Sequence, residues 1–370
     1  MNNRPHKYLI SGGGTGGHIF PAIAIAEAIR DKEPDAQFLF VGANGRMEMT
    51  KVPDAGYSIT GLDISGISRS LNLKNLLFPF RLLKSLVKAG KIIRTFQPDI
   101  AIGTGGYASG PTLYMAARRR IPTLIQEQNA FPGITNKILA RRADTICVSY
   151  DNMQKFFAEE KIVKTGNPIR KQLQSPVENK LEALHFFGLE KDKKTILVVG
   201  GSQGSMAINR TISENIVSIA DKANLIWQTG ENGYTDAIKV SEELSGSNVK
   251  VHKFIKRMDM AYGAADIIIS RAGAIAISEI AVAGKCAIFI PLPTAAEDHQ
   301  TKNAMSLQDQ DAAICMAQKE MPQELLPMIV SLLENEQKVL ELAGNIKSTG
   351  KPNAAESIAN EVFTLLKKHS

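Results

Sequence analysis

Short apolar runs alternate along the whole chain with longer segments in which apolar residues recur at helical spacing. Such runs fit strands that are buried on both faces, and the longer segments fit helices that pack on a sheet. The repeated strand–helix order predicts an α/β fold with parallel sheets. The predicted strands of the first half are 7–11, 37–42, 57–65, 99–103 and 145–149, together with a strand that begins at 122 and runs into a loop by 129, and the helices are 21–31 and 111–119. Those of the second half are 194–199, 225–230, 249–254, 265–270 and 286–291, with a helix at 205–219.

The alternation loosens between residues 169 and 194, where charged and polar residues dominate. We interpret this segment as a linker between an N-terminal domain of residues 1–168 and a C-terminal domain of residues 195–353. Each half opens with a strand that runs into a glycine-rich turn, so we expect two Rossmann-like domains facing each other across a cleft. Ligands of such sheets bind at the carboxyl ends of the strands. The amphipathic helix at 354–368 is expected to pack back on the N-terminal domain.

The first glycine turn, residues 12–17, contains five glycines and leads into an alanine-rich helix that we expect to begin at Pro21. Exposed N–H groups at a helix N-terminus favour an anion or a sugar hydroxyl as ligand. The turn also fits the dinucleotide fingerprint, but the second strand ends at Asn44 without the acidic residue that dinucleotide binding requires. His18 places an ionisable ring at the mouth of the turn. From the sequence alone, a packed or capping histidine and a catalytic one are equally compatible with it.

The second half carries the features that suit a nucleotide diphosphate. The turn at 200–204 repeats the glycine pattern without the lysine of a P-loop. Arg271 follows a buried strand, where its guanidinium group could meet a diphosphate. Glu279 could bind a ribose, although a solvated helix face is the simpler interpretation of it. The polar cluster 297–303 suits sugar hydroxyls. The sequence has no Asp-x-Asp pair at the end of a predicted strand and no spaced ligand set, so no metal or other cofactor is predicted.

The net charge of +7 is concentrated in residues 65–98, which hold seven basic residues and no acidic one. Four of the seven recur at helical spacing, and a bulky apolar cluster precedes them. A basic amphipathic helix of this kind can lie on an anionic membrane, and a solvated helix face is an equally compatible interpretation. The basic residues of this stripe are Arg81, Lys84, Lys88 and Lys91, and the apolar cluster includes Leu76, Phe78 and Phe80.

The remaining composition restricts the compartment and the partners. Three cysteines without disulfide or zinc spacing indicate a reducing compartment. The N-terminus lacks a signal-peptide pattern, and no apolar run is long enough to span a bilayer. We therefore expect a protein of the cytoplasm or of a membrane surface. Nucleic acid is not expected as a partner, because the basic segment lacks interleaved aromatic residues.

Taken together, seven motifs in order along the chain resemble those of the MurG family, the peripheral membrane glycosyltransferases of peptidoglycan synthesis. The motifs are residues 12–21, 105–111, 127–129, 166–170, 200–204, 271–279 and 299–303. The resemblance implies a GT-B fold and metal-independent transfer of GlcNAc from UDP-GlcNAc to the 4-hydroxyl of MurNAc in lipid I, with inversion, giving lipid II and UDP. It further implies a peripheral position on the cytoplasmic face of the inner membrane, where an anionic surface and cell-wall synthesis proteins are expected partners.

The resemblance also implies roles for individual residues. His18 is the candidate base, and the donor UDP-GlcNAc is expected to contact residues of both halves. Ile255 would read uracil through its backbone, and Gln300 would bind the GlcNAc hydroxyls. The remaining donor-side residues are Thr15, Gly16, Gly17 and Asn129 near the sugar, Arg170, Ser202 and Arg271 near the diphosphate, and Ala274, Ile275 and Glu279 around the ribose.

This chain departs from the family pattern at several positions. Gln126 stands where histidine is frequent, and Ala276 removes a hydroxyl near the expected phosphates. Ala272 and Ser205 also differ from the residues most often found. Three alternatives stay open at this point: another UDP-sugar transferase, a UDP-GlcNAc 2-epimerase of the same fold, and a non-catalytic nucleotide-sugar-binding protein.

Overall fold

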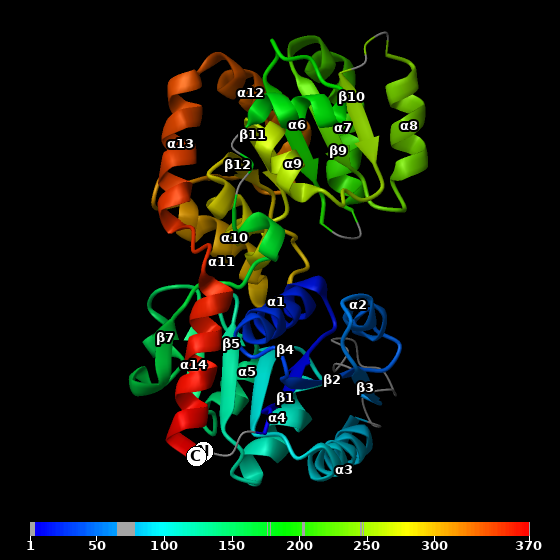
Figure 1. Ribbon diagram of the computed structural model, residues 1–370. Coiled ribbons are helices and arrows are strands. Elements are labelled where there is room, and N and C mark those ends of the chain that lie inside the picture. Colours follow the sequence, from blue (N-terminus) through cyan, green and yellow to red (C-terminus); the bar gives the residue numbers. More distant parts are fainter. Residues whose placement is uncertain are drawn as a thin grey trace. The chain divides into compact units, whose positions relative to one another are not determined.

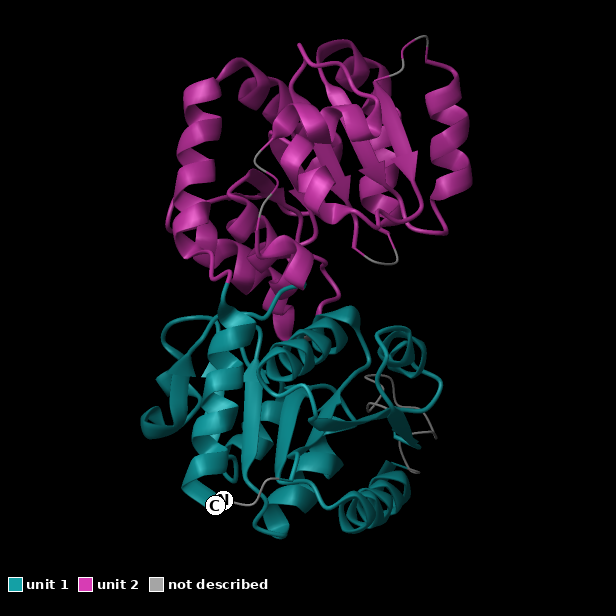
Figure 2. Cartoon of the chain, viewed as in Figure 1, with its two compact units in different colours: residues 1–170, 353–370 teal, residues 171–352 magenta. Residues whose placement is uncertain are grey.

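The computed structural model describes residues 4–64, 78–175, 177, 179–201, 204–244, 246 and 248–369. The chain forms two compact units (Figure 2). Unit 1 comprises residues 1–170 and 353–370, and unit 2 comprises residues 171–352. The expected linker at 169–194 contains α6 (Lys180–Phe187), and nearly all of that segment groups with unit 2.

Unit 1 is built on a seven-stranded parallel sheet in the order β3-β2-β1-β4-β5-β6-β7 (Figure 1). Its strands are β1 (Lys7–Gly12), β2 (Gln37–Ala43), β3 (Ile59–Leu62), β4 (Ile100–Gly105), β5 (Thr123–Glu127), β6 (Thr145–Val148) and β7 (Ile162–Lys164). Its helices are α1 (Gly16–Lys32), α2 (Glu48–Asp54), α3 (Phe78–Phe96), α4 (Ser109–Arg118), α5 (Ile134–Ala140) and α14 (Ala354–His369), with short 3₁₀ turns at Met153–Lys155 and Glu159–Lys161.

Unit 2 is built on a six-stranded parallel sheet in the order β10-β9-β8-β11-β12-β13. Its strands are β8 (Thr195–Val199), β9 (Asn224–Gln228), β10 (Val249–His252), β11 (Ile267–Ser270), β12 (Cys286–Phe289) and β13 (Ile314–Cys315). Its helices, besides α6, are α7 (Met206–Lys222), α8 (Tyr234–Glu242), α9 (Met258–Ala264), α10 (Ala274–Ala283), α11 (His299–Gln308), α12 (Met321–Glu334) and α13 (Glu336–Thr349), with 3₁₀ turns at Lys171–Leu173 and Ala296–Asp298.

The strands of unit 1 alternate their buried residues between two helical layers. On β1, Tyr8 and Ile10 pack with α1 and α14, whereas Leu9 packs with α3, α4 and α5. Because both faces are covered, the strands read as continuous apolar runs, which explains why they are recognisable in the sequence. The prediction of an α/β fold with two Rossmann-like sheets is confirmed.

Helix α1 begins at Gly16, five residues earlier than the predicted start at Pro21. Glycine is a poor helix former, but the carbonyl of Thr15 accepts bonds from the amides of His18 and Ile19. The hydroxyl of Thr104, on β4, donates to the carbonyl of His18 at 2.8 Å. Tertiary contacts therefore extend the helix toward its N-terminus, through glycine residues whose own helix propensity is low.

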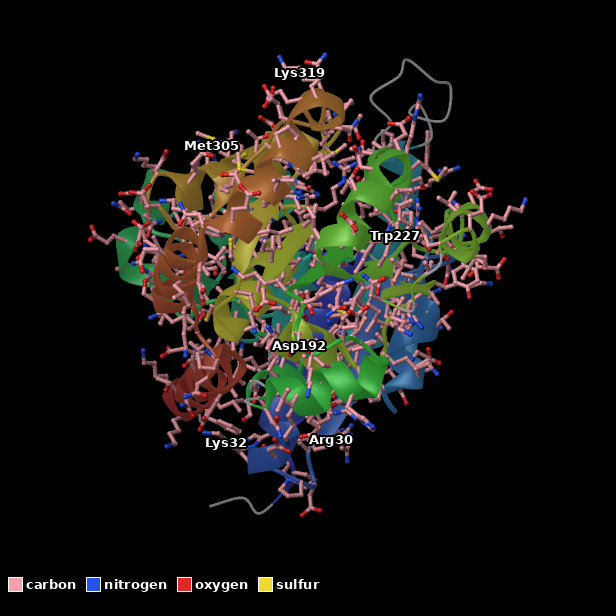
Figure 3. The ribbon with its side chains drawn as sticks, turned by 90° about the horizontal axis from the view of Figure 1, so that it is seen from above. Arg30, Lys32, Asp192, Trp227, Met305 and Lys319 are labelled. Atoms are coloured by element: carbon pink, nitrogen blue, oxygen red, sulfur yellow. The ribbon has the colours of Figure 1, made fainter. Side chains whose placement is uncertain are left out.

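Helix α14 returns the end of the chain to unit 1, where it packs against α1 (Figures 1 and 2). Its residues Ile358 and Val362 are fully buried in the same core as Tyr8 and Ile10. Lys32, labelled in Figure 3 near the end of α1, donates to Glu356 at 2.9 Å. The contact between the two helices is thus a buried apolar stripe with an exposed ion pair beside it.

We expect Ile358→Ala to destabilise unit 1 by about 2–5 kcal/mol, because it leaves a cavity in a packed core. The single tryptophan, Trp227, lies fully buried in unit 2 (Figure 3) and reports on that unit alone. In urea, the unfolding transition of unit 1, followed by far-UV circular dichroism, should move its midpoint to a lower urea concentration. The midpoint of the Trp227 fluorescence transition should stay the same. Thr364→Ala, on the exposed side of the same helix, is the matched control. A shift confined to the fluorescence transition would contradict the assignment of α14 to unit 1.

Candidate active site

The carboxyl edge of the unit 1 sheet brings together three loops that are far apart in the sequence. Strand β1 lies beside β4, with Gly12 paired to Gly105, and β4 lies beside β5. The chain leaves β1 toward β2 and β3 on one side, whereas β4 to β7 continue on the other. Ligands of open parallel sheets bind at such a point of reversal. This edge is therefore the candidate site of unit 1.

The turns after β1 and β4 approach so closely that a side chain would not fit between them. A Cβ atom on Gly106 would lie 2.2 Å from the carbonyl oxygen of Gly13. Gly105 and Gly106 also have φ angles of 98° and 86°, in the left-handed region that favours glycine. A Cβ atom on Gly105 would meet the His18 ring at 2.9 Å. The second glycine turn therefore forms a wall against the imidazole of the first.

His18 lies in the first turn of α1 with a half-buried side chain. Its Nδ1 atom is 3.1 Å from Oε1 of Gln128, which follows β5 and is itself buried. The Gln128 amide nitrogen donates to the carbonyl of Thr104 at 2.7 Å. His18 is thus held by β4 and β5 and does not serve as a helix cap. The structure brings the ring to the same edge as both glycine turns.

A buried carboxylate that sequence reasoning missed supports the first turn. Glu48, the first residue of α2, is fully buried and accepts hydrogen bonds from the amides of Gly14 at 3.0 Å and Ala43 at 2.9 Å. The carboxylate expected after β2 in dinucleotide-binding proteins is thus absent at the strand end, and Glu48 folds back from the next helix instead. Because it occupies an amide of the turn and brings negative charge there, it disfavours a phosphate in this turn.

Glu127, at the end of β5, organises the loop that follows it. Its two carboxylate oxygens accept from the amides of Asn129 and Gly133 and from the side chains of Asn129 and Asn136, at 2.9–3.2 Å. Burial raises the pKa of this carboxyl, and these N–H donors act in the opposite direction. Since all four partners donate, the ionised form is the one that satisfies them. Asn129 is therefore positioned by Glu127.

The corresponding edge of unit 2 lies between β8 and β11, where the strand order reverses again. The glycine turn from Gly200 leads into α7, and the amide of Arg271 donates to the carbonyl of Val199. Ser205 caps α7 by accepting from the amide of Ile208. Backbone amides and the helix dipole at the N-terminus of α7 therefore favour an anionic ligand at this point of reversal. Ser202, expected at the diphosphate, lies outside the described residues.

The guanidinium group of Arg271 is engaged within unit 2. Its Nη1 donates to the carbonyls of Ile290 and Pro291, and its Nη2 donates to Ser205 at 2.6 Å and to Gln318 at 2.7 Å. Burial lowers the pKa of this guanidinium. These bonds tie the ends of β11 and β12 to the cap of α7. Arg271 therefore stabilises the N-terminus of α7 from within unit 2.

Glu279, on α10, is 5% exposed, so the interpretation as a solvated helix face is wrong. Its Oε2 atom accepts from the hydroxyl of Tyr262 at 3.2 Å. Ile255 is buried, and its amide donates to Gln228 at 2.9 Å. The amide oxygen of Gln300 accepts from the amide of Leu292 at 2.9 Å. Several of the expected ligand-binding residues therefore also hold the loops of unit 2.

The other expected site residues are placed as follows. Thr15 is exposed at the N-cap of α1, and Gly16 and Gly17 supply amides to its first turn, where the helix itself offers no acceptor. Ala274 and Ile275 form the first turn of α10. Arg170 is the last residue of the first segment of unit 1. Among the described residues, no group of His, Cys, Asp and Glu could hold a metal ion.

Two Rossmann-like units, each with a glycine turn at its strand-order reversal, are characteristic of the GT-B fold. Residues 8–148 match the glycosyltransferase family 28 N-terminal domain, and residues 195–358 match the glycosyltransferase family 28 C-terminal domain. The chain belongs to glycosyltransferase family 28.

Close relatives cover almost the whole chain. A protein of Parabacteroides distasonis is 50% identical over 99% of this chain and 100% of its own length. One of Christiangramia forsetii is 49% identical over 97% of this chain and 98% of its own length. Both are named UDP-N-acetylglucosamine–N-acetylmuramyl-(pentapeptide) pyrophosphoryl-undecaprenol N-acetylglucosamine transferase.

Solved structures agree with this assignment. MurG of Acinetobacter baumannii superimposes with a TM-score of 0.78 at 31% identity, covering 98% of this chain and 100% of that one. A UDP-GlcNAc 2-epimerase of Neisseria meningitidis has a TM-score of 0.67 at 13% identity, covering 97% of this chain and 100% of that one. The epimerase likeness shows the fold alone.

We expect Glu127→Gln to destabilise unit 1 by about 2–4 kcal/mol, because the amide keeps one acceptor and turns an NH₂ group toward N–H donors. The measurement is urea unfolding followed by far-UV circular dichroism. Glu159→Gln, at an exposed position of the same unit, is the control. Equal stability of the Glu127 variant and the wild type would show that Glu127 does not organise this loop as its contacts indicate.

Proposed function

We propose that this protein transfers GlcNAc from UDP-GlcNAc to the 4-hydroxyl of MurNAc in lipid I, giving lipid II and UDP. The observation that carries the proposal is the identity of about half of all residues, over nearly the full length, with relatives that bear the name of this transferase. The alternative of a UDP-GlcNAc 2-epimerase rests on fold likeness at 12–13% identity and is not favoured.

In the proposed reaction, unit 2 holds the donor. The diphosphate lies at the N-terminus of α7, where backbone amides and the helix dipole stabilise the negative charge that develops on the leaving UDP. Arg271 supports this turn through Ser205, and Glu279 offers a carboxylate to the ribose, oriented by Tyr262. Ile255, Ala274 and Ile275 surround the nucleoside, and Gln300 contacts the sugar.

Unit 1 supplies the base. The 4-hydroxyl oxygen of the acceptor attacks the anomeric carbon of GlcNAc, the bond from that carbon to the phosphate oxygen breaks, and the hydroxyl proton passes to His18. A single displacement of this kind inverts the configuration. Support for His18 comes from its place at the strand-order reversal, with its ring held between Gly105 and Gln128. Thr15, Gly16, Gly17 and Asn129 line the same edge and are assigned to the sugars.

We expect His18→Ala to lower kcat by roughly 10²–10⁴-fold, the usual contribution of a general base. The assay is UDP release from UDP-GlcNAc in the presence of a lipid I analogue. His185→Ala, which removes an exposed histidine of α6, is the control and should keep full activity. Unchanged turnover of the His18 variant would eliminate His18 as the base. UDP release at the same rate without acceptor would contradict the transferase itself.

We also propose that α3 carries the protein onto an anionic membrane surface, where a lipid-linked acceptor has to be met. The buried residues of α3 are small or apolar, such as Ser85, Ala89 and Ile93. Phe80, Leu83 and Val87 are instead 72%, 62% and 68% exposed, and they recur at helical spacing beside the basic stripe. Apolar side chains in this position can insert among lipid headgroups. The exposed apolar stripe favours the membrane over a solvated helix face.

The four basic residues of the α3 stripe differ in exposure. Lys84 and Lys91 are exposed, while Arg81 and Lys88 are half-buried. Lys84 lies 3.3 Å from Asp63, a pair of exposed side chains that contributes little free energy. Phe78 begins the helix, and Leu76 lies outside the described residues. None of the described helices is both long and apolar enough to cross a bilayer. We assign the protein to the cytoplasmic face of the inner membrane, with cell-wall synthesis proteins as proposed partners.

Reversing Arg81, Lys84, Lys88 and Lys91 to glutamate should weaken binding to anionic vesicles roughly a thousandfold, since each basic residue near the surface contributes about 1 kcal/mol. Vesicle sedimentation at low and high salt measures the effect. The control reverses Lys222, Lys239, Lys319 and Lys351, which are exposed on unit 2 and change the net charge equally. Equal loss in both variants would show a general charge effect, and no loss in the first would overturn the proposed surface.

A further inference from the structure

A chain of buried amide side chains leads away from His18. The ring lies next to Oε1 of Gln128, the Gln128 amide nitrogen lies next to Oε1 of Gln126, and the Gln126 amide nitrogen donates to Oδ1 of Asn167 at 2.9 Å. The Asn167 amide nitrogen then donates to the main-chain carbonyl of Gln128 at 3.0 Å. The three amide side chains are at most 2% exposed. Buried side-chain amides are nearly always hydrogen-bonded, so these contacts restrict how the three groups are oriented.

The direction of the hydrogen bonds along this series of amides is fixed by main-chain carbonyl groups, which can only accept. Asn167 must turn its NH₂ group to the carbonyl of Gln128, so its oxygen faces Gln126. Gln128 must turn its NH₂ group to the carbonyl of Thr104, at 2.7 Å, and also to the carbonyl of Gln126, at 3.2 Å. Rotating the Gln128 amide by half a turn would bring its oxygen against these carbonyl oxygens. The oxygen of Gln128 therefore faces His18.

We propose that Gln128 is a positioning residue that fixes neutral His18 with its proton on Nδ1, leaving the lone pair on Nε2. An amide oxygen accepts and cannot donate, so the ring nitrogen 3.1 Å away has to be the donor. The hydroxyl of Thr104 holds the main chain of the same residue, and Gly105 lies against the ring. The inference rests on the proposed role of His18 as base, since it names the nitrogen that takes the acceptor proton.

The amide oxygen of Gln128 carries no formal charge, and this affects the stability of protonated His18. In triads of the Ser-His-Asp type, a carboxylate orients the histidine and also stabilises the imidazolium that forms. Gln128 gives the same orientation through an uncharged oxygen. Its carbonyl dipole stabilises the imidazolium less than a carboxylate would, so the proton taken from the acceptor can be released again for the next turnover. Gln128 therefore orients the ring of His18 without strongly stabilising the positive charge that the ring acquires.

Nitrogen-15 NMR of the full-length protein, labelled at its six histidines, tests the inference. The signals of His18 are identified by their loss in His18→Ala, and their shifts report which ring nitrogen carries the proton above the pKa. We expect the Nδ1–H form in the wild type. An Nε2–H form would overturn the inference directly, whether or not the histidine is the base.

Two variants of Gln128 sharpen the test. Gln128→Met has similar length but no strong acceptor, so we expect a mixture of tautomers and a kcat lower by roughly 10–100-fold, with the KM for UDP-GlcNAc little changed. Gln128→Glu keeps an acceptor at the ring when its second oxygen is protonated and donates to the carbonyl of Thr104, and in this state it should keep the Nδ1–H form. Asn224→Ala removes a buried amide of unit 2 and controls for destabilisation alone. An Nδ1–H signal that persists unchanged in Gln128→Met would refute the role of Gln128. Full activity of His18→Ala beside an Nδ1–H signal would refute the base and leave the tautomer assignment standing.

Discussion

The close approach of the turns that follow β1 and β4 is the constraint on which the unit 1 site depends. These strands are neighbours in the sheet, and both end in glycine-rich turns that meet at the same edge. The distances left for a Cβ atom on Gly105 or Gly106 are shorter than side chains tolerate. This contact brings His18 against the second turn and within reach of Gln128, so a loop that begins more than a hundred residues later can orient it. Glycine is needed here because it has no side chain to separate the two turns, as well as because it adopts positive φ angles easily.

The polar groups behind this contact are buried and hydrogen-bonded. Glu48 closes the first turn, Glu127 organises the loop after β5, and the amides of Gln126, Gln128 and Asn167 form a directed chain. A buried polar network of this kind is costly when a single member is lost, because the partner left behind has no water. Unit 2 shows the same principle, with Arg271 joining two strand ends to the cap of α7. In both units, polar side chains hold the turns at the carboxyl ends of the strands.

Several site features could be predicted from local patterns, and others could not. The glycine turns and Arg271 stand out because each directly follows a buried strand. Glu48 carries no such signal, since it begins a short helix and reaches the first turn only when α2 folds back. For Glu279, the sequence of its helix alone favours a solvated face and only the family resemblance indicates a ribose contact, because the helix gives no hint of what covers it. Glu279 is buried beside Tyr262. Gln128 was visible within the Glu127–Asn129 motif, but its partner could be identified only once β5 was placed beside β4.

The sequence by itself determined the α/β class, the repeated Rossmann-like halves, the glycine turns and the basic stripe of α3, because each is encoded in spacing along one segment. The resemblance of its motifs indicated the family, and the comparisons confirmed it. Only the tertiary structure decided the order of the strands, the return of α14 to unit 1, the outward position of Leu83 and Val87, and the chain of amides behind His18. These depend on contacts between distant segments. A hydrogen bond such as that between His18 and Gln128 leaves no local pattern in either segment, so it appears only when the sheet aligns them.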